Sequence, residues 1–338
     1  MPLPSASPGV VVFAGAATLD VITLVTRFPE PNERQVAEDL IHAGGGPAAT
    51  AAVAAARLGQ PAAFVGTVGD DAEGERIIEG LRAEGVDVAG VHVASGGRSG
   101  ASVVVVDRGR GTRMISARPA PPPDIRADSP AAALIQQAQW VHTDHVGWGP
   151  VAAFRHGQQP GQRRPWLSVD AGNPIPDFRP ADVDLYAPTV EALTHAYGDR
   201  ARAELIDAAL ADGARWVVAT DGANSTVAGT ETGQRYTAPV HRVAALSTLG
   251  AGDVFHGALV TAIVRGMPPQ ACLSYANIVA GLSCRCLDGR SAIPSDAEAR
   301  THLPDRAAAG HDSWETSAPQ QRAGTGMTYG SSTRKERA

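Results

Sequence analysis

The sequence predicts an α/β fold: a doubly wound, mostly parallel sheet flanked by helices, with a small β-lid. Short β-branched runs that stop at polar turns alternate with alanine-rich or amphipathic stretches of helical length. Two segments interrupt this alternation and favour antiparallel strands. With 338 residues, 43% of them hydrophobic and 19% charged, the chain is large enough for one large α/β domain.

The elements follow in order along the chain. Residues 9–20 (GVVVFAGAATLD) predict a buried strand that ends in a loop, and the small residues of 46–59 predict a tightly packed helix. Further strands are expected within 62–71, 140–144, 166–172 and 215–222, and further helices within 73–86 and 202–213. Ligands of such sheets bind at the carboxyl ends of the strands.

The two interrupting segments predict the lid, over about residues 20–43 and 98–117. Strands are expected at 33–43 and 99–116, the second as a hairpin that turns at 108–111. The domain is expected to span 9–304. Residues 305–338 are polar and rich in Gly and Ser, so we expect this C-terminal tail to be disordered.

Composition excludes several classes of function. A net charge of −6 and a pI near 5.9 argue against a nucleic-acid partner. The three cysteines, Cys272, Cys284 and Cys286, form no zinc pattern and fit a reducing compartment. The N-terminus lacks the features of a signal peptide, and no apolar run approaches the ~20 residues that span a bilayer. We therefore expect a cytoplasmic protein with no membrane partner.

The stretch STLGAGDVFHGAL, residues 247–259, predicts an anion site at the start of a helix. The N–H groups of Gly250, Ala251 and Gly252 would form a cradle for developing negative charge, helped by the helix dipole. Asp253 would then lie beside that cradle as a base that takes a proton from a hydroxyl group. This combination indicates phosphoryl transfer to a hydroxyl.

Together with GGGPAATAAVAAARLG at 44–59, this motif identifies a resemblance to the ribokinase-like, PfkB-type carbohydrate kinases over about residues 10–300. The resemblance implies transfer of the ATP γ-phosphoryl group to a sugar hydroxyl, with Mg²⁺. It implies that Asp253 is the catalytic base and that Gly250, Ala251 and Gly252 form the anion hole. The other implied positions are Asp20, at the end of the first strand, with Gly44 and Gly45 for the sugar, and Thr220 and Gly222 for the nucleotide phosphates. Asn277, with DGRSAIP at 288–294, is implied for the adenine wall.

Three positions depart from the family pattern. Ser247 replaces an Asp that commonly helps to hold a monovalent cation, so K⁺ activation stays open and we expect weak dependence on potassium. Ala49 replaces an Asn that touches the sugar, so the sugar contacts must partly differ. YAPTVEAL stands in place of the Asn-x-x-Glu motif that orders magnesium, which leaves Glu191 as the candidate there.

Within the family, both motifs, including Ala49, most resemble the sulfofructose kinases. A sulfonate needs fixed cationic donors, and arginine suits an oxyanion best. Arg34, Arg113 and Arg118, in or near the lid strands, are the candidates for binding it; the alternative is that they are solvated surface charges. The segment 142–149 supplies no further arginine.

Several alternatives stay open. A nucleoside kinase shares the fold but needs aromatic stacking, and aromatics are only 5% of this chain. A non-catalytic sugar- or nucleotide-binding regulatory protein would be expected to lose Asp253. His142, Asp144 and His145 suggest a metal site, but a strand would send the two histidines to opposite faces. His256 is expected to pack away from Asp253, and exposed lid edges favour a homodimer through the lid.

Overall fold

The computed structural model describes residues 9–159 and 163–304. The main sheet contains β1 (Val11–Ala14), β4 (Ala62–Gly69), β5 (Asp87–Ala94), β8 (Trp140–Thr143), β9 (Trp166–Ala171), β10 (Leu185–Pro188), β11 (Trp216–Ala219), β12 (Thr226–Thr230) and β13 (Arg235–Ala238). The helices are α1 (Pro47–Arg57), α2 (Ala72–Ala83), α3 (Pro130–Gln137), α4 (Trp148–His156), α5 (Val190–Tyr197), α6 (Arg202–Ala211), α7 (Ala251–Val264), α8 (Pro269–Ser283), α9 (Asp296–Thr301) and the 3-10 helix η1 (Pro180–Asp182). The predicted disordered tail lies outside the described residues.

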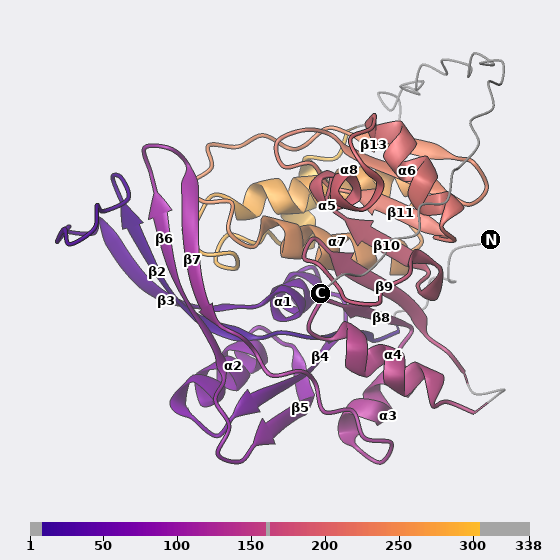
Figure 1. Cartoon of the computed structure of the whole chain (residues 1–338), viewed down its shortest axis with the longest axis horizontal. Coiled ribbons are helices and arrows are strands. Elements are labelled where there is room, and N and C mark those ends of the chain that lie inside the picture. Colours follow the sequence, from indigo (N-terminus) through magenta and orange to yellow (C-terminus); the bar gives the residue numbers. More distant parts are fainter. Residues whose placement is uncertain (1–8, 160–162, 305–338) are drawn as a thin grey trace, which may run out of the picture.

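The main sheet has the strand order β13-β12-β11-β10-β9-β8-β1-β4-β5 (Figure 1). All neighbours from β5 to β11 pair in parallel, and only the pairs β11–β12 and β12–β13, at one edge, are antiparallel. The predicted doubly wound, mostly parallel sheet is therefore confirmed. The sequence analysis did not anticipate β10 or the β12–β13 hairpin.

Side chains of the central strand β1 alternate between the two faces of the sheet. Val11 and Phe13 pack into the cluster that contains α1, α7 and α8. Val12 and Ala14 pack into the cluster that contains α3, α4, α5 and α6. Because both faces of the sheet are covered, the central strand β1 is apolar at every position, which explains its run VVFA.

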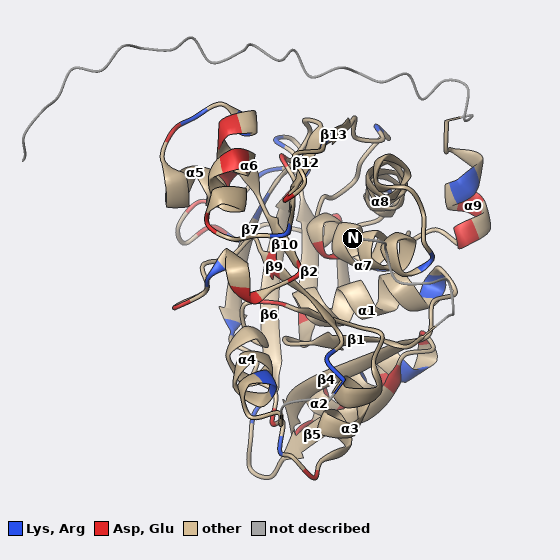
Figure 2. Cartoon of the chain, turned by 90° about the vertical axis from the view of Figure 1, so that its right-hand side faces the viewer, with Lys and Arg blue, Asp and Glu red and all other residues tan. Residues whose placement is uncertain are grey.

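Helices α1 and α7 carry the two glycine- and alanine-rich motifs and pack against each other. Arg57 and Asp253 are the only charged residues in α1, α7 and α8, which are almost entirely tan in Figure 2. A Cβ at Gly257 would overlap the Ala51 carbonyl oxygen and lie 3.0 Å from Ala54 Cβ. The small residues are thus needed for close contact between the two helices, and this contact joins motifs some 200 residues apart in the chain.

Replacing Gly257 with Ala is expected to lower the free energy of unfolding by about 1–3 kcal/mol, because the added methyl group forces α7 away from the α1 backbone. The matched control is Gly80→Ala in α2, where nothing lies within 4 Å of the new Cβ. There the gain in helix propensity should stabilise the protein by about 0.5–1 kcal/mol. Urea unfolding of both variants checks this, and equal stabilities would contradict the packing argument.

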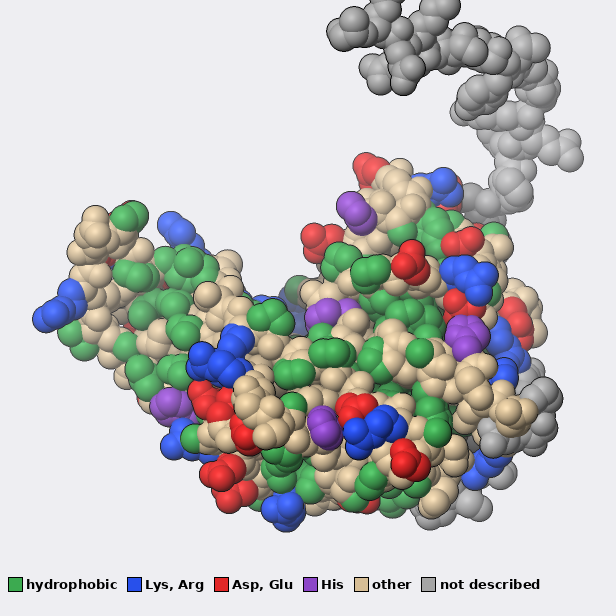
Figure 3. Space-filling model, turned by 60° about the horizontal axis from the view of Figure 1, so that its bottom comes forward, with side chains coloured by type: hydrophobic (Ala, Val, Ile, Leu, Met, Phe, Trp, Pro, Cys, Tyr) green, Lys and Arg blue, Asp and Glu red, His purple; other side chains and the backbone are tan. Residues whose placement is uncertain are grey.

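A second sheet forms the predicted lid, with the order β3-β2-β6-β7. Its strands are β2 (Thr18–Val25), β3 (Asp39–Gly45), β6 (Gly100–Asp107) and β7 (Thr112–Arg118). The hairpin turn at 108–111 is confirmed, and β2–β3 and β6–β7 pair antiparallel. The expectation of antiparallel pairing was incomplete, because the central pair β2–β6 is parallel. In Figure 3 the lid projects as a lobe separated by a notch from the rest of the molecule.

Two boundaries in the lid differ from the expectation. Residues 33–38 are not in a strand, and β3 begins only at Asp39, because the polar run before it is largely exposed and has no regular structure. Asp20 does not end the first strand of the main sheet; it lies inside β2, since the chain turns at residues 15–17 and enters the lid sheet. Within the described residues, no helix has both the length and the apolar character required for crossing a membrane.

Candidate active site

The three residues predicted to form the anion cradle, Gly250, Ala251 and Gly252, lie at the N-terminus of α7. Gly250 caps the helix in a left-handed conformation, with φ 72° and ψ 1°, which favours glycine. A Cβ at this position would also lie 3.0 Å from the Gly289 Cα. Among the described residues, the N–H of Ala251 bonds the Thr248 carbonyl at 3.3 Å, whereas those of Gly252 and Asp253 have no acceptor. These free N–H groups and the helix dipole can bind an anion.

Asp253 lies in the first turn of α7, partly buried beside these N–H groups. The pKa of its carboxyl group is raised well above the ordinary value, chiefly because the surrounding protein desolvates it, and further because the Asp170 and Asp144 carboxylates repel its charge. Arg290 and Arg113 oppose this rise. A carboxylate with a raised pKa beside an anion site is a stronger base than a solvated one.

Asp170, the penultimate residue of β9, belongs to a cluster of buried polar side chains. The sequence analysis did not identify this residue. Asp170 Oδ1 lies 3.6 Å from His256 Nε2, and the His256 ring stacks on His142 with centroids 5.4 Å apart. His142 Nδ1 is 2.8 Å from Ser168 Oγ. The expected packing of His256 is thus confirmed, and its ring also approaches an acid that influences Asp253. The available signal was that Asp170 ends a strand at the ligand-binding edge of the sheet.

Asp144 joins three segments at the same edge of the sheet. Its Oδ2 accepts the N–H groups of Ala16 at 2.8 Å and Ala48 at 3.1 Å, and its Oδ1 accepts those of Val146 and Gly147, both at 2.9 Å. This carboxylate therefore stabilises the end of β1 and the N-termini of α1 and α4. The described residues contain no group of three His, Cys, Asp or Glu side chains that could hold a metal ion.

The residues implied for sugar binding meet at the junction of the lid and α1. Asp20 is buried, and its Oδ1 accepts the Ser102 hydroxyl at 2.7 Å. A Cβ at Gly45 would overlap Asp20 Oδ2, and a Cβ at Gly44 would overlap the guanidinium group of Arg290. The glycines are therefore required by the close approach of a carboxylate and of an arginine. Ala49, where the family pattern has Asn, is fully buried in α1.

The three lid arginines differ in position. Arg113 Nη1 donates to Thr248 Oγ1 at 3.0 Å, so this side chain reaches the loop that leads into the anion site. Arg118 Nε donates to the Ser99 carbonyl at 2.7 Å, and its Nη2 lies 3.5 Å from Glu73. Arg34 lies in the segment before β3, and both Arg34 and Arg113 are exposed. Of the three, the structure brings only Arg113 to the α7 N-terminus.

The residues implied for nucleotide binding lie around the end of β11. The N–H of Thr220 bonds the Pro188 carbonyl at 3.1 Å, and Gly222 has φ 55° in the following turn. Glu191 is exposed in the first turn of α5, which follows the adjacent strand β10. Asn277 is buried in α8 with its amide bonded to protein: its Oδ1 accepts the Thr226 hydroxyl at 2.8 Å, and its Nδ2 donates to two carbonyls. Asn277 thus orders the wall of this region rather than offering a free amide.

A lid and a helix N-terminus with free N–H groups beside a carboxyl group of raised pKa form the arrangement expected of a phosphoryl-transfer enzyme of the α/β class. The comparison with known families agrees with this class and is more specific. The model of the pfkB family carbohydrate kinases matches residues 10–296. The chain belongs to this family and is a carbohydrate kinase.

Curated relatives and solved structures agree with this assignment. The chain is 27% identical over 300 residues to an ATP-dependent ribose-1-phosphate kinase of Halopiger xanaduensis, covering 86% of this chain and 96% of the relative. It is 24% identical over 294 residues to the ketohexokinase of Mus musculus, covering 81% and 95%. The structure of Arabidopsis thaliana ribokinase complexed with ribose and ATP superposes with a TM-score of 0.72 at 22% identity, covering 89% and 98%. At that identity, the likeness to the solved structure shows the fold.

Proposed function

We propose that this protein phosphorylates a hydroxyl group of a sugar with ATP and that Asp253 is the catalytic base. The observation that carries the proposal is the position of Asp253: a carboxylate with a raised pKa, in the first turn of α7 beside N–H groups that have no acceptor among the described residues. A base must lie close to the anion that forms during transfer, and this geometry supplies both in one helical turn.

In this mechanism Asp253 accepts the proton of the attacking hydroxyl. Gly250 holds the start of α7 so that the N–H groups of the first turn face the transferred phosphoryl group. Asp20 and the last two residues of β3, Gly44 and Gly45 (the acceptor glycines), bind the acceptor sugar, and the lid excludes water that would otherwise hydrolyse ATP. Thr220 and Gly222 form the nucleotide-phosphate turn, and Asn277 supports the adenine wall.

Mg²⁺ would act with the nucleotide, since it keeps several waters and is usually held by substrate phosphates with one or two carboxylates. Glu191 is the proposed carboxylate, and its exposed position at the end of β10 fits such a shared site. When bound, Mg²⁺ neutralises charge on the phosphates. The Ser247 hydroxyl accepts the N–H of Leu249 at 3.1 Å and carries no charge, which supports the expected weak dependence on K⁺.

The acceptor is proposed to be a ketohexose or an anionic sugar such as sulfofructose. The relatives include a kinase for ribose 1-phosphate and a ketohexokinase, and Arg113 lies at the anion site, which favours an anionic group. A coupled assay of ADP release over fructose, ribose, sulfofructose, tagatose, ribose 1-phosphate and nucleosides tests the proposal. Turnover of a sugar supports it, whereas turnover of nucleosides alone, or of no compound, contradicts it.

The pH dependence of kcat/KM tests the electrostatic environment of Asp253. Activity requires the carboxylate, so it is present above the pKa of Asp253 and is lost as the pH falls through that pKa. The Asp170→Asn substitution removes a repelling charge and lowers the pKa of Asp253, so the acid limb should move to lower pH. Asp207→Asn on the surface helix α6 is the control, and identical acid limbs in the two variants would contradict the interaction.

We further propose that the lid mediates a homodimer. Leu40, Val103 and Met114 are 58%, 51% and 55% exposed and share one face of the lid sheet. The lobe in Figure 3 also carries hydrophobic side chains. Exposed apolar surface of this kind marks an interaction site, and a second copy is the occupant we propose.

The oligomeric state in solution checks the dimer. Sedimentation equilibrium should give a dimeric mass for the wild type and a monomeric mass for Val103→Glu, because a buried unpaired carboxylate opposes the contact. Val93→Glu in β5, a site that is 48% exposed and outside the lid, is the control. A monomeric wild type, or a Val103→Glu variant that remains dimeric, excludes the lid contact.

A further inference from the structure

Arg290 is a buried arginine of the segment 288–294, which the family resemblance assigns to the adenine wall; its side chain lies instead against Gly45 and Thr50. The residue is 8% exposed, and its guanidinium group bonds two segments of the acceptor region: Nη2 donates to the Gly45 carbonyl at 2.8 Å, and Nε donates to Thr50 Oγ1 at 3.2 Å. Nη1 packs against Gly44. The Arg290 side chain therefore contacts both acceptor glycines, at the end of β3, and the first turn of α1.

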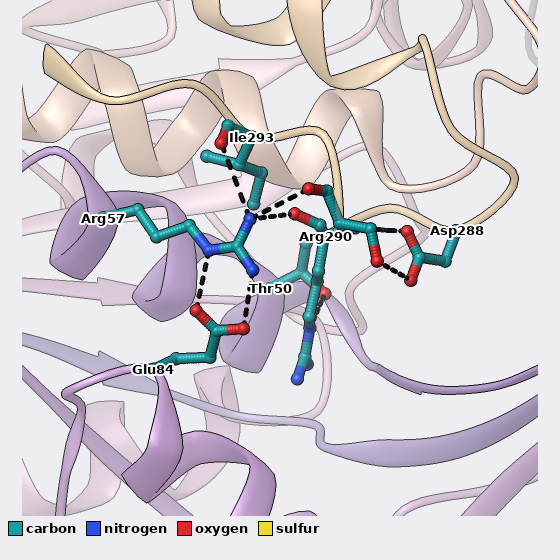
Figure 4. Close-up of polar contacts among 7 residues, drawn as sticks. Thr50, Arg57, Glu84, Asp288, Arg290 and Ile293 are labelled. Atoms are coloured by element: carbon teal, nitrogen blue, oxygen red, sulfur yellow. Dashed lines mark hydrogen bonds and ion pairs between the residues drawn. The ribbon is translucent and has the colours of Figure 1, made fainter. Parts of the chain in front are cut away.

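The backbone around Arg290 is held on both sides (Figure 4). Asp288 Oδ1 accepts the N–H groups of Arg290 at 3.3 Å and Ser291 at 2.8 Å. Arg57 Nη1 donates to the Arg290 carbonyl at 2.6 Å, and Arg57 is itself fixed by a bidentate ion pair with Glu84. Planar, paired contacts of this kind fix geometry better than single hydrogen bonds. The segment therefore presents the Arg290 side chain in a defined orientation.

The same segment also reaches the anion site. Gly289, immediately before Arg290, packs against Gly250, so closely that a Cβ on Gly250 would lie 3.0 Å from the Gly289 Cα. Gly250 sets the direction of the free N–H groups of α7, and Arg290 sets the position of Gly45. Gly289 thus contacts the start of α7, and the next residue, Arg290, contacts the acceptor glycines. A single segment therefore touches both halves of the site.

The charge of Arg290 also lacks a direct partner. Among the described residues no carboxylate lies within ion-pair distance of its guanidinium group, although Asp20, Glu84, Asp253 and Asp288 attract it from farther away. Burial lowers the pKa of Arg290 to about 10, so it remains charged at neutral pH. Burying a cation without a close partner is costly. A role of the Arg290 charge at the site, where it acts on Asp20 and Asp253, would explain why a cation is buried here.

We propose that Arg290 is a positioning residue that couples the acceptor glycines, Gly44 and Gly45 at the end of β3, to the anion hole at Gly250 and supplies a fixed positive charge that acts on Asp20 and Asp253. The inference rests on the proposed kinase function of this site. Arg290 contacts neither reacting atom in this scheme. It holds the acceptor glycines at a fixed distance from the base, Asp253. Its charge also favours the carboxylate form of Asp253.

Four variants separate the two parts of this role. Arg290→Met removes the charge and both bonds, Arg290→Lys keeps the charge but loses the planar fork, and Thr50→Val removes one acceptor. Arg57→Met loosens the segment and leaves the Arg290 charge in place. Each is assayed for kcat, for KM of the acceptor sugar and for the pH profile of kcat/KM, and thermal unfolding shows that each is folded.

In Arg290→Met, kcat/KM for the acceptor should fall roughly 10²-fold, since misplacement of reacting groups by about 1 Å costs that much. The acid limb of its pH profile should move to higher pH. Asp253 lies among Asp170 of β9, Asp144 after β8, Arg113 of β7 and Arg290, so removal of one of these two cations favours the protonated acid. Arg290→Lys and Arg57→Met should raise KM while keeping the acid limb of the wild type.

The outcomes distinguish this inference from the proposed function. If the wild type is active and Arg290→Met has the same kcat/KM as the wild type, the coupling role of Arg290 is wrong while the proposed kinase function stands. Acid limbs that move equally in Arg290→Met and Arg57→Met overturn the electrostatic part. If Arg290→Met does not fold, Arg290→Lys and Thr50→Val decide, since wild-type KM in both would contradict the positioning role. A wild type that phosphorylates no sugar contradicts the proposed function itself.

Discussion

Replacing Asp253 with Asn is expected to lower kcat by at least about 10²-fold, the smallest usual contribution of a positioned general base. Asparagine keeps the size of the side chain and its local hydrogen bonding but cannot accept the hydroxyl proton. The substitution leaves the N–H groups of the α7 N-terminus and the acceptor glycines unchanged, so the affinity for sugar and for nucleotide should stay close to that of the wild type. Steady-state kinetics at saturating sugar measure the loss.

The control for Asp253→Asn is Asp207→Asn on α6, a carboxylate that is paired with Arg235 on the surface. It should turn over at the wild-type rate. Calorimetric titration with nucleotide checks that the Asp253 variant retains its binding site. Near wild-type kcat in Asp253→Asn would falsify the assignment of this residue as the base, whatever the acceptor sugar.

Truncating Arg113 to Ala should reduce kcat/KM for an anionic sugar by about 2–4 kcal/mol, which corresponds to roughly 30- to 1,000-fold. Arg113 reaches Thr248 at the entrance to the anion site, and its charge is felt by Asp253. If the acceptor carries a sulfonate, the truncation strands a desolvated anion without its cation. For a neutral sugar such as fructose, the same change should have little effect.

Arg118→Ala and Arg34→Ala serve as matched controls for Arg113→Ala. Arg118 is bonded to Ser99 and Glu73, and Arg34 is exposed before β3, so neither substitution should discriminate between sulfofructose and fructose. A selective loss confined to Arg113 identifies the anion anchor. If the wild type does not phosphorylate sulfofructose, or if all three variants treat both sugars as the wild type does, the sulfosugar proposal is wrong and a neutral acceptor is favoured.

Local signals predicted the main architecture well. Apolar runs such as Val11–Ala14, which end at polar turns, indicated buried parallel strands, and the Gly-rich turn at 108–111 indicated a hairpin. The parallel pairing of β2 with β6 could not be found in this way, because it joins segments about 80 residues apart and depends on register between strands that have no common turn. Strand β10, of sequence LYAP, has no β-branched residue and ends in proline, and a glycine interrupts β12, so neither gave a clear strand signal.

The sequence by itself determined the class of chemistry. The glycine at 250 and the acid at 253 lie within one helical turn, so their relation follows from helix geometry alone. Asp170 and Arg290 reach the same site only through tertiary contacts; Arg290 and Gly45 are 245 residues apart, and no spacing rule connects them. Local periodicity specifies which face of an element a side chain occupies. The neighbours that then alter its pKa and fix its position are decided by how distant elements pack, because desolvation and Coulomb interactions depend on distance in space.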